Sequence, residues 1–114
     1  MKLQTLLDGA RYLGQAEGDR KAYSVFDTDN HYLLLGPTQD GYFLNLVDKD
    51  SPEVITKAFA GKKVTAGEVR KNSKRPDLFD KSFASLSALY VMVALRRARK
   101  LKQRRGKSLV FKIK

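Results

Sequence analysis

The chain has 114 residues, no cysteine and a formal net charge of +11 at pH 7. This length is typical of one domain with a modest core, and a hydrophobic fraction of 42% is sufficient for folding. The absence of cysteine excludes disulfide bonds and thiolate metal sites. Asp8 interrupts the first residues, and the longest apolar-rich stretch, 82–95, is too short to cross a bilayer. We therefore expect one cytoplasmic domain over residues 1–114, without a signal peptide or a membrane span.

The charge is divided unequally along the chain. Residues 1–57 hold six Lys or Arg and nine Asp or Glu, whereas residues 58–114 hold seventeen Lys or Arg and three acids. Residues 96–114 contain ten basic residues and no acid. Such a segment repels itself unless counterions or phosphates neutralise it. The sequence therefore favours a polyanion site in the C-terminal half over a cationic surface kept for solubility, an acidic protein partner or a membrane surface.

Residues 1–50 are expected to form a helix followed by a three-stranded antiparallel meander. Leu3, Leu6 and Leu7 fall on one helical stripe, which Gly9 or Gly14 can end. Aromatic and β-branched residues separated by turn-forming residues predict three strands, at 22–27, 31–35 and 42–47. We expect the aromatic residues of these strands to pack in the core rather than stack on bases, because this half of the chain is net acidic.

Two short helices are expected after the meander. Ser51 is a good N-cap with Pro52 behind it, and Gly61 can end this helix. Thr65 and Glu68 have the spacing of a capping box, which predicts a second short helix up to about residue 72.

The longest helix signal begins at Ser82. Apolar residues recur at intervals of three and four, and residues 88–95 are apolar on nearly every side, so this part must be buried. Beyond it, residues 101–103 and 108–113 have strand character and flank a turn at 104–107. The sequence therefore predicts an exposed basic hairpin at the C-terminus.

This order of elements resembles the winged helix-turn-helix family over residues 51–114. In that family the third helix enters the DNA major groove by its N-terminal part, and the hairpin, called the wing, contacts the flanking backbone or minor groove. The resemblance implies groove contacts from Lys81, Ser82 and Ser85, with Ser87 as a further candidate, and wing contacts from Lys102, Arg104, Arg105 and Lys107. Further candidates for phosphate contact are Lys74, Arg75, Arg97 and Lys100. The connector 71–81 exceeds the usual turn of about 3–4 residues, and residues 76–79 are expected to add a helical turn.

The sequence thus predicts an α+β fold with two subregions. Residues 1–50 form the N-terminal helix and the three-stranded antiparallel meander. Residues 51–114 form a winged-helix-like three-helix module with a C-terminal β-hairpin.

Motifs for catalysis are few. His31 is the only histidine, so a zinc site would need three carboxylates. Asp27 and Asp29, or Asp48 and Asp50, could hold a magnesium ion with one further carboxylate, but aspartates that form turns are commoner. The chain has neither a phosphate-cradling glycine loop nor a dinucleotide-binding fingerprint. We therefore expect no cofactor, no metal and no enzymatic activity, with a metal-dependent nuclease as a less favoured alternative.

The favoured prediction is a nucleic-acid-binding protein that contacts duplex DNA mainly through phosphates, as a transcriptional regulator or nucleoid-type protein. DNA is favoured over RNA because of the order of elements, and charge alone does not separate the two. Two alternatives stay open, an RNA-binding or ribosome-associated protein and a protein-interaction module. In the second, the acidic meander would contact a protein partner or a second copy of the chain.

Overall fold

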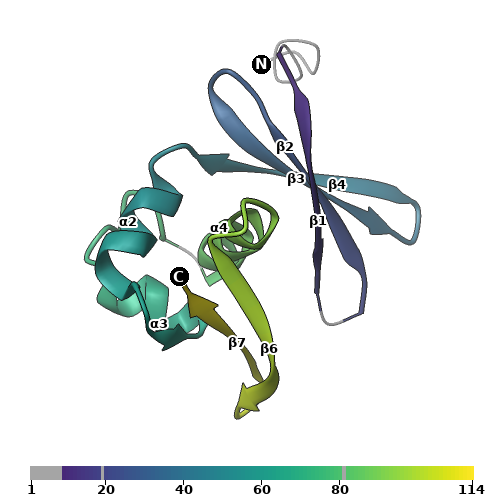
Figure 1. The fold of residues 1–114 in the computed structure, drawn as a ribbon. Coiled ribbons are helices and arrows are strands. Elements are labelled where there is room, and N and C mark those ends of the chain that lie inside the picture. The colour runs from purple at the N-terminus through teal and green to yellow at the C-terminus, as the bar shows by residue number, and fades with distance from the viewer. Residues whose placement is uncertain (1–8, 19, 81) are drawn as a thin grey trace.

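The computed structural model describes residues 9–18, 20–80 and 82–114. The described chain begins with a four-stranded antiparallel meander whose strands are neighbours in chain order (Figure 1). These strands are β1 (Arg11–Glu17), β2 (Ala22–Asp27), β3 (His31–Thr38) and β4 (Gly41–Asp48). The predicted strands at 22–27, 31–35 and 42–47 are therefore confirmed as β2, β3 and β4, the last two longer than expected.

The C-terminal half contains three helices and a smaller sheet. In chain order the elements are α2 (Ser51–Phe59), β5 (Lys63–Val64), α3 (Ala66–Asn72), α4 (Ser82–Ala94), β6 (Ala98–Arg105) and β7 (Ser108–Ile113). The three strands form an antiparallel sheet in the order β5-β7-β6, which we call the C-terminal sheet.

The structure is α+β, but the predicted architecture is wrong in two respects. The meander has four strands instead of three, because β1 precedes it in a region where no strand was predicted. The winged-helix-like three-helix module is also wrong: α4 is the one helix that leads directly into the C-terminal strands, and β5 separates α2 from α3. The predicted N-terminal helix around Leu3, Leu6 and Leu7 lies outside the described residues.

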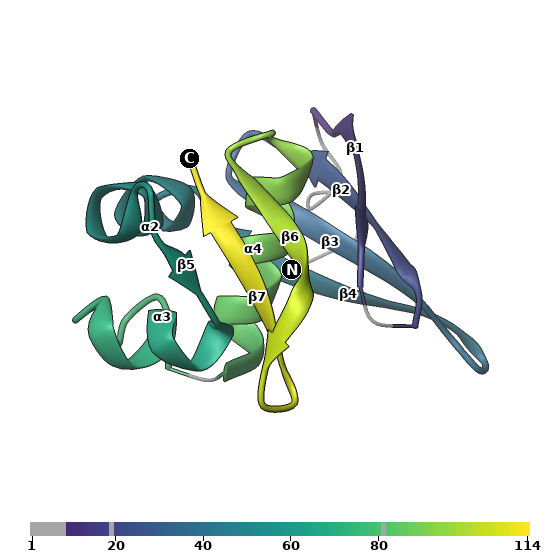
Figure 2. The same ribbon diagram turned by 60° about the horizontal axis from the view of Figure 1, so that its bottom comes forward.

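The helix α4 explains why the three helices do not form a module of their own. Residues 88–92 of α4 are all buried, so this helix has no side that faces water along that length. In both views it lies between the meander on one side and α2 and α3 on the other, and it also contacts β6 (Figure 1, Figure 2). Its core cluster includes Val25 and Leu34 from the meander and Phe111 and Ile113 from the C-terminal sheet. A helix that is apolar all round needs partners on every side.

The strand β1 was missed because a glycine interrupts its pattern. Gly14 has φ 144°, a value that L side chains rarely adopt, and the register between β1 and β2 shifts between Tyr12 and Gly14. This irregularity is typical of a β-bulge, which breaks the alternation of side chains by which strands are predicted.

Several local predictions hold in detail. The capping box is present: the Thr65 hydroxyl accepts a hydrogen bond from the Glu68 amide at 3.2 Å, and the Glu68 carboxylate accepts one from the Thr65 amide at 3.0 Å. The predicted N-cap of α2 is wrong by one position: Asp50, and not Ser51, occupies the N-cap, and Ser51 is the first residue of the helix. In the part of the chain that the structure describes, no helix combines the length and apolar character needed to span a membrane.

Leu89→Ala tests the central position of α4. Leu89 is fully buried between the two sheets, so the substitution leaves a cavity and should lower the free energy of unfolding by about 2–5 kcal/mol. The measurement is urea denaturation followed by circular dichroism. Leu46→Ala is the control, because Leu46 is 45% exposed on the meander and should cost much less. Equal losses in the two variants would show that α4 is not the centre of the core.

Candidate nucleic-acid interface

Three cations lie in register across the C-terminal sheet. Lys63 of β5 pairs with Lys112 of β7, and Lys112 pairs with Arg99 of β6. Their strand neighbours Val64 and Phe111 belong to the core, so alternation directs this cation row to the opposite face. Strands β5, β6 and β7 contain no acidic residue, and the ion pairs found between described residues do not include these three.

The electrostatics of the cation row oppose folding. Directly opposed side chains on neighbouring strands have Cβ atoms roughly 5 Å apart, and like charges at such positions are destabilising. One charge is partly compensated, because the Lys112 ammonium donates a hydrogen bond to the Gly61 carbonyl at 2.6 Å. The row therefore has a positive potential that a bound anion would stabilise.

The cation row borders a basic cleft at the C-terminal end of the sheet. The cleft has a volume of about 430 Å³ and is lined by Arg96, Arg99, Lys112 and Lys114 around Val93 and Ala98. None of these lining residues is acidic. The cleft thus gathers four cations from the end of α4 to the last residue of the chain.

A second cleft lies at the other end of the C-terminal sheet, and we call it the hairpin cleft. It has a volume of about 490 Å³ and lies between the β1–β2 turn, the beginning of α3, α4 and the β6–β7 hairpin. Arg20 and Lys21 come from the β1–β2 turn, and Arg104 and Lys107 from the hairpin. The remaining lining residues are Tyr23, Ala66, Gly67, Leu86, Tyr90, Ser108 and Leu109. The cleft therefore combines four cations with an aromatic and aliphatic lining, and none of the described residues that line it is acidic.

Two contacts hold the walls of the hairpin cleft together. The Lys100 ammonium, from β6, donates a hydrogen bond to the Gly18 carbonyl of the β1–β2 turn at 3.2 Å. A Cβ atom at Gly18 would lie 2.6 Å from the Tyr23 ring and 3.0 Å from the Tyr90 hydroxyl oxygen, so only glycine permits this close approach. The turn is thereby fixed against the aromatic side of the cleft.

The aromatic side of the cleft belongs to a longer row of rings. Tyr90 stacks on Tyr23 with centroids 4.7 Å apart, Tyr23 meets Phe43 edge-on at 5.8 Å, and Phe43 lies 6.1 Å from Phe83. Tyr90 is buried, Tyr23 and Phe43 are half-buried, and Phe83 is 47% exposed. The row therefore runs from the core to the surface, and the prediction that the meander aromatics pack in the core describes only its inner part.

Three of the predicted phosphate contacts are already paired with acids. Arg75 forms two hydrogen bonds with Asp77, at 2.9 and 2.8 Å. These bonds raise the pKa of Arg75 and lower that of Asp77. Arg97 donates to Glu53 and to Thr56 at 2.8 Å, and Arg105 forms an ion pair with Glu68. All three arginines are thus partly neutralised; Arg97 and Arg105 connect separate parts of the fold, whereas Arg75 and Asp77 lie in the same connector between α3 and α4.

The residues predicted to enter the DNA groove are either buried or outside the described residues. Ser85 is fully buried and its hydroxyl has no hydrogen-bond partner among the described residues, so it offers no surface to a ligand. Ser87 is also buried, and its hydroxyl accepts a hydrogen bond from the Asn45 side chain at 3.3 Å. Lys81 and the side chain of Ser82 lie outside the described residues.

The remaining predicted residues are exposed. Lys74 lies in the connector between α3 and α4 with φ 59°, Lys102 lies on β6, and Arg104 and Lys107 line the hairpin cleft. The cations of these sites that sequence reasoning missed are Arg20, Lys21, Lys63, Arg96, Arg99, Lys112 and Lys114. Strand pairing and the approach of the two turns bring them into these sites, and neither is visible in the local sequence.

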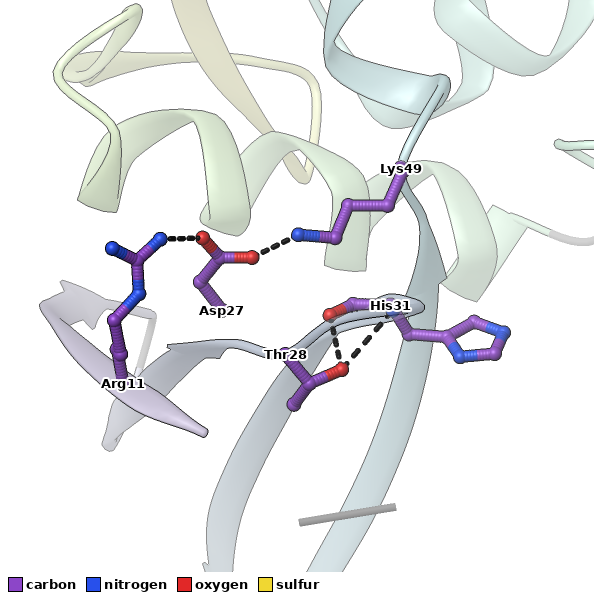
Figure 3. Close-up of polar contacts among 5 residues, drawn as sticks. All are labelled: Arg11, Asp27, Thr28, His31 and Lys49. Carbon is purple, nitrogen blue, oxygen red and sulfur yellow. Dashed lines mark hydrogen bonds and ion pairs between the residues drawn. The ribbon is translucent and has the colours of Figure 1, made fainter. Parts of the chain in front are cut away.

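Two of the four carboxylates considered for a magnesium site, those of Asp27 and Asp48, are engaged in other contacts. Figure 3 shows Asp27 between Arg11 and Lys49, with one carboxylate oxygen bound to each. Thr28 forms two hydrogen bonds with the backbone of His31 (Figure 3). The Asp48 carboxylate accepts one from the Asp50 amide at 2.9 Å. Among the residues that the structure describes, no three His, Asp or Glu side chains gather as metal ligands.

The surroundings of Asp27 change its acidity. Partial burial alone would raise the pKa of Asp27, but the hydrogen bonds from Lys49 and Arg11 outweigh burial and lower it below its usual value. The ionised form is therefore the one that the fold stabilises.

Asp27→Asn should weaken the acid dependence of stability. A lowered pKa in the folded state contributes stability above pH ~4, and this contribution is lost as the pH falls through the folded-state pKa. At pH 7 we expect a loss of about 1–2 kcal/mol, because Asp27 is mostly buried and accepts two charged hydrogen bonds. Denaturation at several pH values should show the difference between the variant and the parent shrinking as the pH falls below ~4. Asp40→Asn, at an exposed turn, is the control. A difference that is equal at all pH values would contradict the role of the ionised carboxylate.

Comparison of the chain with protein-family models, with curated proteins and with solved structures found no match. The resemblance to the winged helix-turn-helix family is neither supported nor contradicted by these comparisons and stays a prediction.

Proposed function

We propose that this protein is a non-enzymatic nucleic-acid-binding protein that contacts the phosphate backbone through its C-terminal sheet and hairpin. The observation that carries the proposal is the cation row of Lys63, Lys112 and Arg99, on three paired strands without an acid. Opposed like charges cost stability in the free protein, and polyphosphate is the partner that relieves this cost along an extended path. The proposal implies a cytoplasmic or nucleoid location.

The distribution of acids supports a polyanion over a surface kept for solubility. Glu53, Glu68 and Asp77 each form an ion pair with one arginine, so each of these three acids already neutralises one cation. A surface that serves only solubility mixes both signs of charge. Here Lys63, Arg99 and Lys112 gather on the C-terminal sheet, and further cations line the two clefts beside it.

Duplex DNA is the favoured ligand, and structured RNA is the alternative. The C-terminal sheet and the hairpin provide cations along β6 from Arg99 to Arg104, and the pairing of this strand with β7 shifts register between Lys100 and Arg104. Contacts of this kind follow a phosphate backbone without reading its sequence. The proposal therefore predicts binding to many DNA sequences with similar affinity.

Salt dependence tests the proposal directly. If about five cations contact phosphates, a plot of the logarithm of the DNA association constant against the logarithm of salt concentration should have a slope of about −4 to −5. Lys63→Gln combined with Arg99→Gln should make the slope less steep by about 2, because each contact contributes about 0.9. The measurement is fluorescence anisotropy with a labelled duplex over a salt series.

The matched control removes the same charge elsewhere. Lys57→Gln combined with Arg70→Gln changes two exposed cations on α2 and α3 and should leave the slope unchanged. Equal effects of the two double variants would show that overall charge, and not the cation row, drives binding. A salt-insensitive interaction would refute the electrostatic account, and stronger binding to structured RNA than to duplex DNA would favour the alternative.

A further inference from the structure

The hairpin cleft has features that phosphate contacts alone do not require. Its volume of about 490 Å³ lies within the range of sites that enclose small organic molecules, about 300–1,000 Å³. An exposed phosphodiester chain needs only a surface with cations. The cleft therefore has room for a group larger than a phosphate.

The lining of the hairpin cleft contains both apolar and charged groups. Leu86, Leu109 and Tyr23 supply apolar and aromatic surface, and the plane of Tyr23 is fixed by its stacking on Tyr90. Cations lie on both sides, from the β1–β2 turn and from the hairpin. A flat aromatic group that carries negative charge matches both parts of this lining, because bases stack on aromatic side chains and phosphates pair with Arg and Lys.

From this lining we infer that the hairpin cleft binds a single unpaired nucleotide, with its base against Tyr23, Leu86 and Leu109 and its phosphates near Arg20, Arg104 and Lys107. The inference rests on the proposed function, because we assign the nucleotide to a strand held by the C-terminal sheet. Arg99 of the cation row and Arg104 of the cleft lie on the same strand, β6. A backbone that follows β6 can deliver an extrahelical nucleotide into the cleft.

The position of Gly67 allows the cleft to be filled without changing its charge. Gly67 lines the cleft, and a Cβ atom there would meet only the Thr65 hydroxyl oxygen, at 3.9 Å. Gly67→Gln therefore places a neutral side chain in the space of the base and is compatible with the backbone of α3. Ala58→Gln is the matched control, at an exposed position of α2 that does not line the cleft.

The experiment compares a fully paired duplex with the same duplex carrying a one-nucleotide bulge, by fluorescence anisotropy at fixed salt. The parent should bind the bulged duplex more tightly, by about fivefold or more, because stacking of one base adds to the phosphate contacts. Gly67→Gln should lose this preference and keep the affinity for the paired duplex. Ala58→Gln should change neither.

The outcomes separate this inference from the proposed function. Equal affinity of the parent for both duplexes, or a preference that survives Gly67→Gln, would overturn the inference while leaving phosphate binding intact. Absence of binding to either duplex would refute the proposed function and the strand-borne nucleotide together.

A second arm identifies the source of the nucleotide. A nucleoside 5′-monophosphate is titrated into the protein and followed by NMR. Weak binding at Tyr23, Leu86 and Leu109, together with the bulge preference, supports the inference. Tight binding of the monophosphate without any bulge preference would make the ligand a free nucleotide and overturn the assignment to a strand.

Discussion

The burial of α4 is the constraint on which the rest of the structure depends. Residues 88–92 are apolar on all sides, so the helix must be covered by the meander and by the C-terminal sheet at once. This arrangement brings the β1–β2 turn of the acidic half against the basic hairpin, where Lys100 binds the Gly18 carbonyl. The hairpin cleft is thus a consequence of how the core is closed, and its cations come from both halves of the chain.

The packing of the two sheets around α4 also determines which charges are neutralised. Arg97 and Arg105 connect β-structure to helices through Glu53 and Glu68, so part of the basic C-terminal segment stabilises the fold. The cations on the outer face of the C-terminal sheet have no acid beside them on its strands. Net charge therefore overstates the surface available to a polyanion, and strand register shows where that surface lies.

The sequence predicted what depends on neighbours in the chain. The capping box of Thr65 and Glu68, the start of α4 at Ser82 and three meander strands were all readable from local patterns. The strand β1 was hidden by the bulge at Gly14, and the three-helix module was wrong because periodicity shows that a helix is buried without showing what covers it. For the site, too, only the local part was predicted. Arg104 and Lys107 were expected from the hairpin pattern, whereas the cation row depends on the pairing of β5, β7 and β6, which the local sequence does not show.

The most direct test of the central claim is a lysine footprint. The reactivity of each lysine amine toward an acetylating reagent is measured by mass spectrometry, with and without saturating duplex DNA at low salt. The account predicts strong protection of Lys63 and Lys107 and unchanged reactivity of Lys57 on α2. Protection of Lys57 equal to that of Lys63 and Lys107 would contradict a phosphate-binding surface on the C-terminal sheet and hairpin.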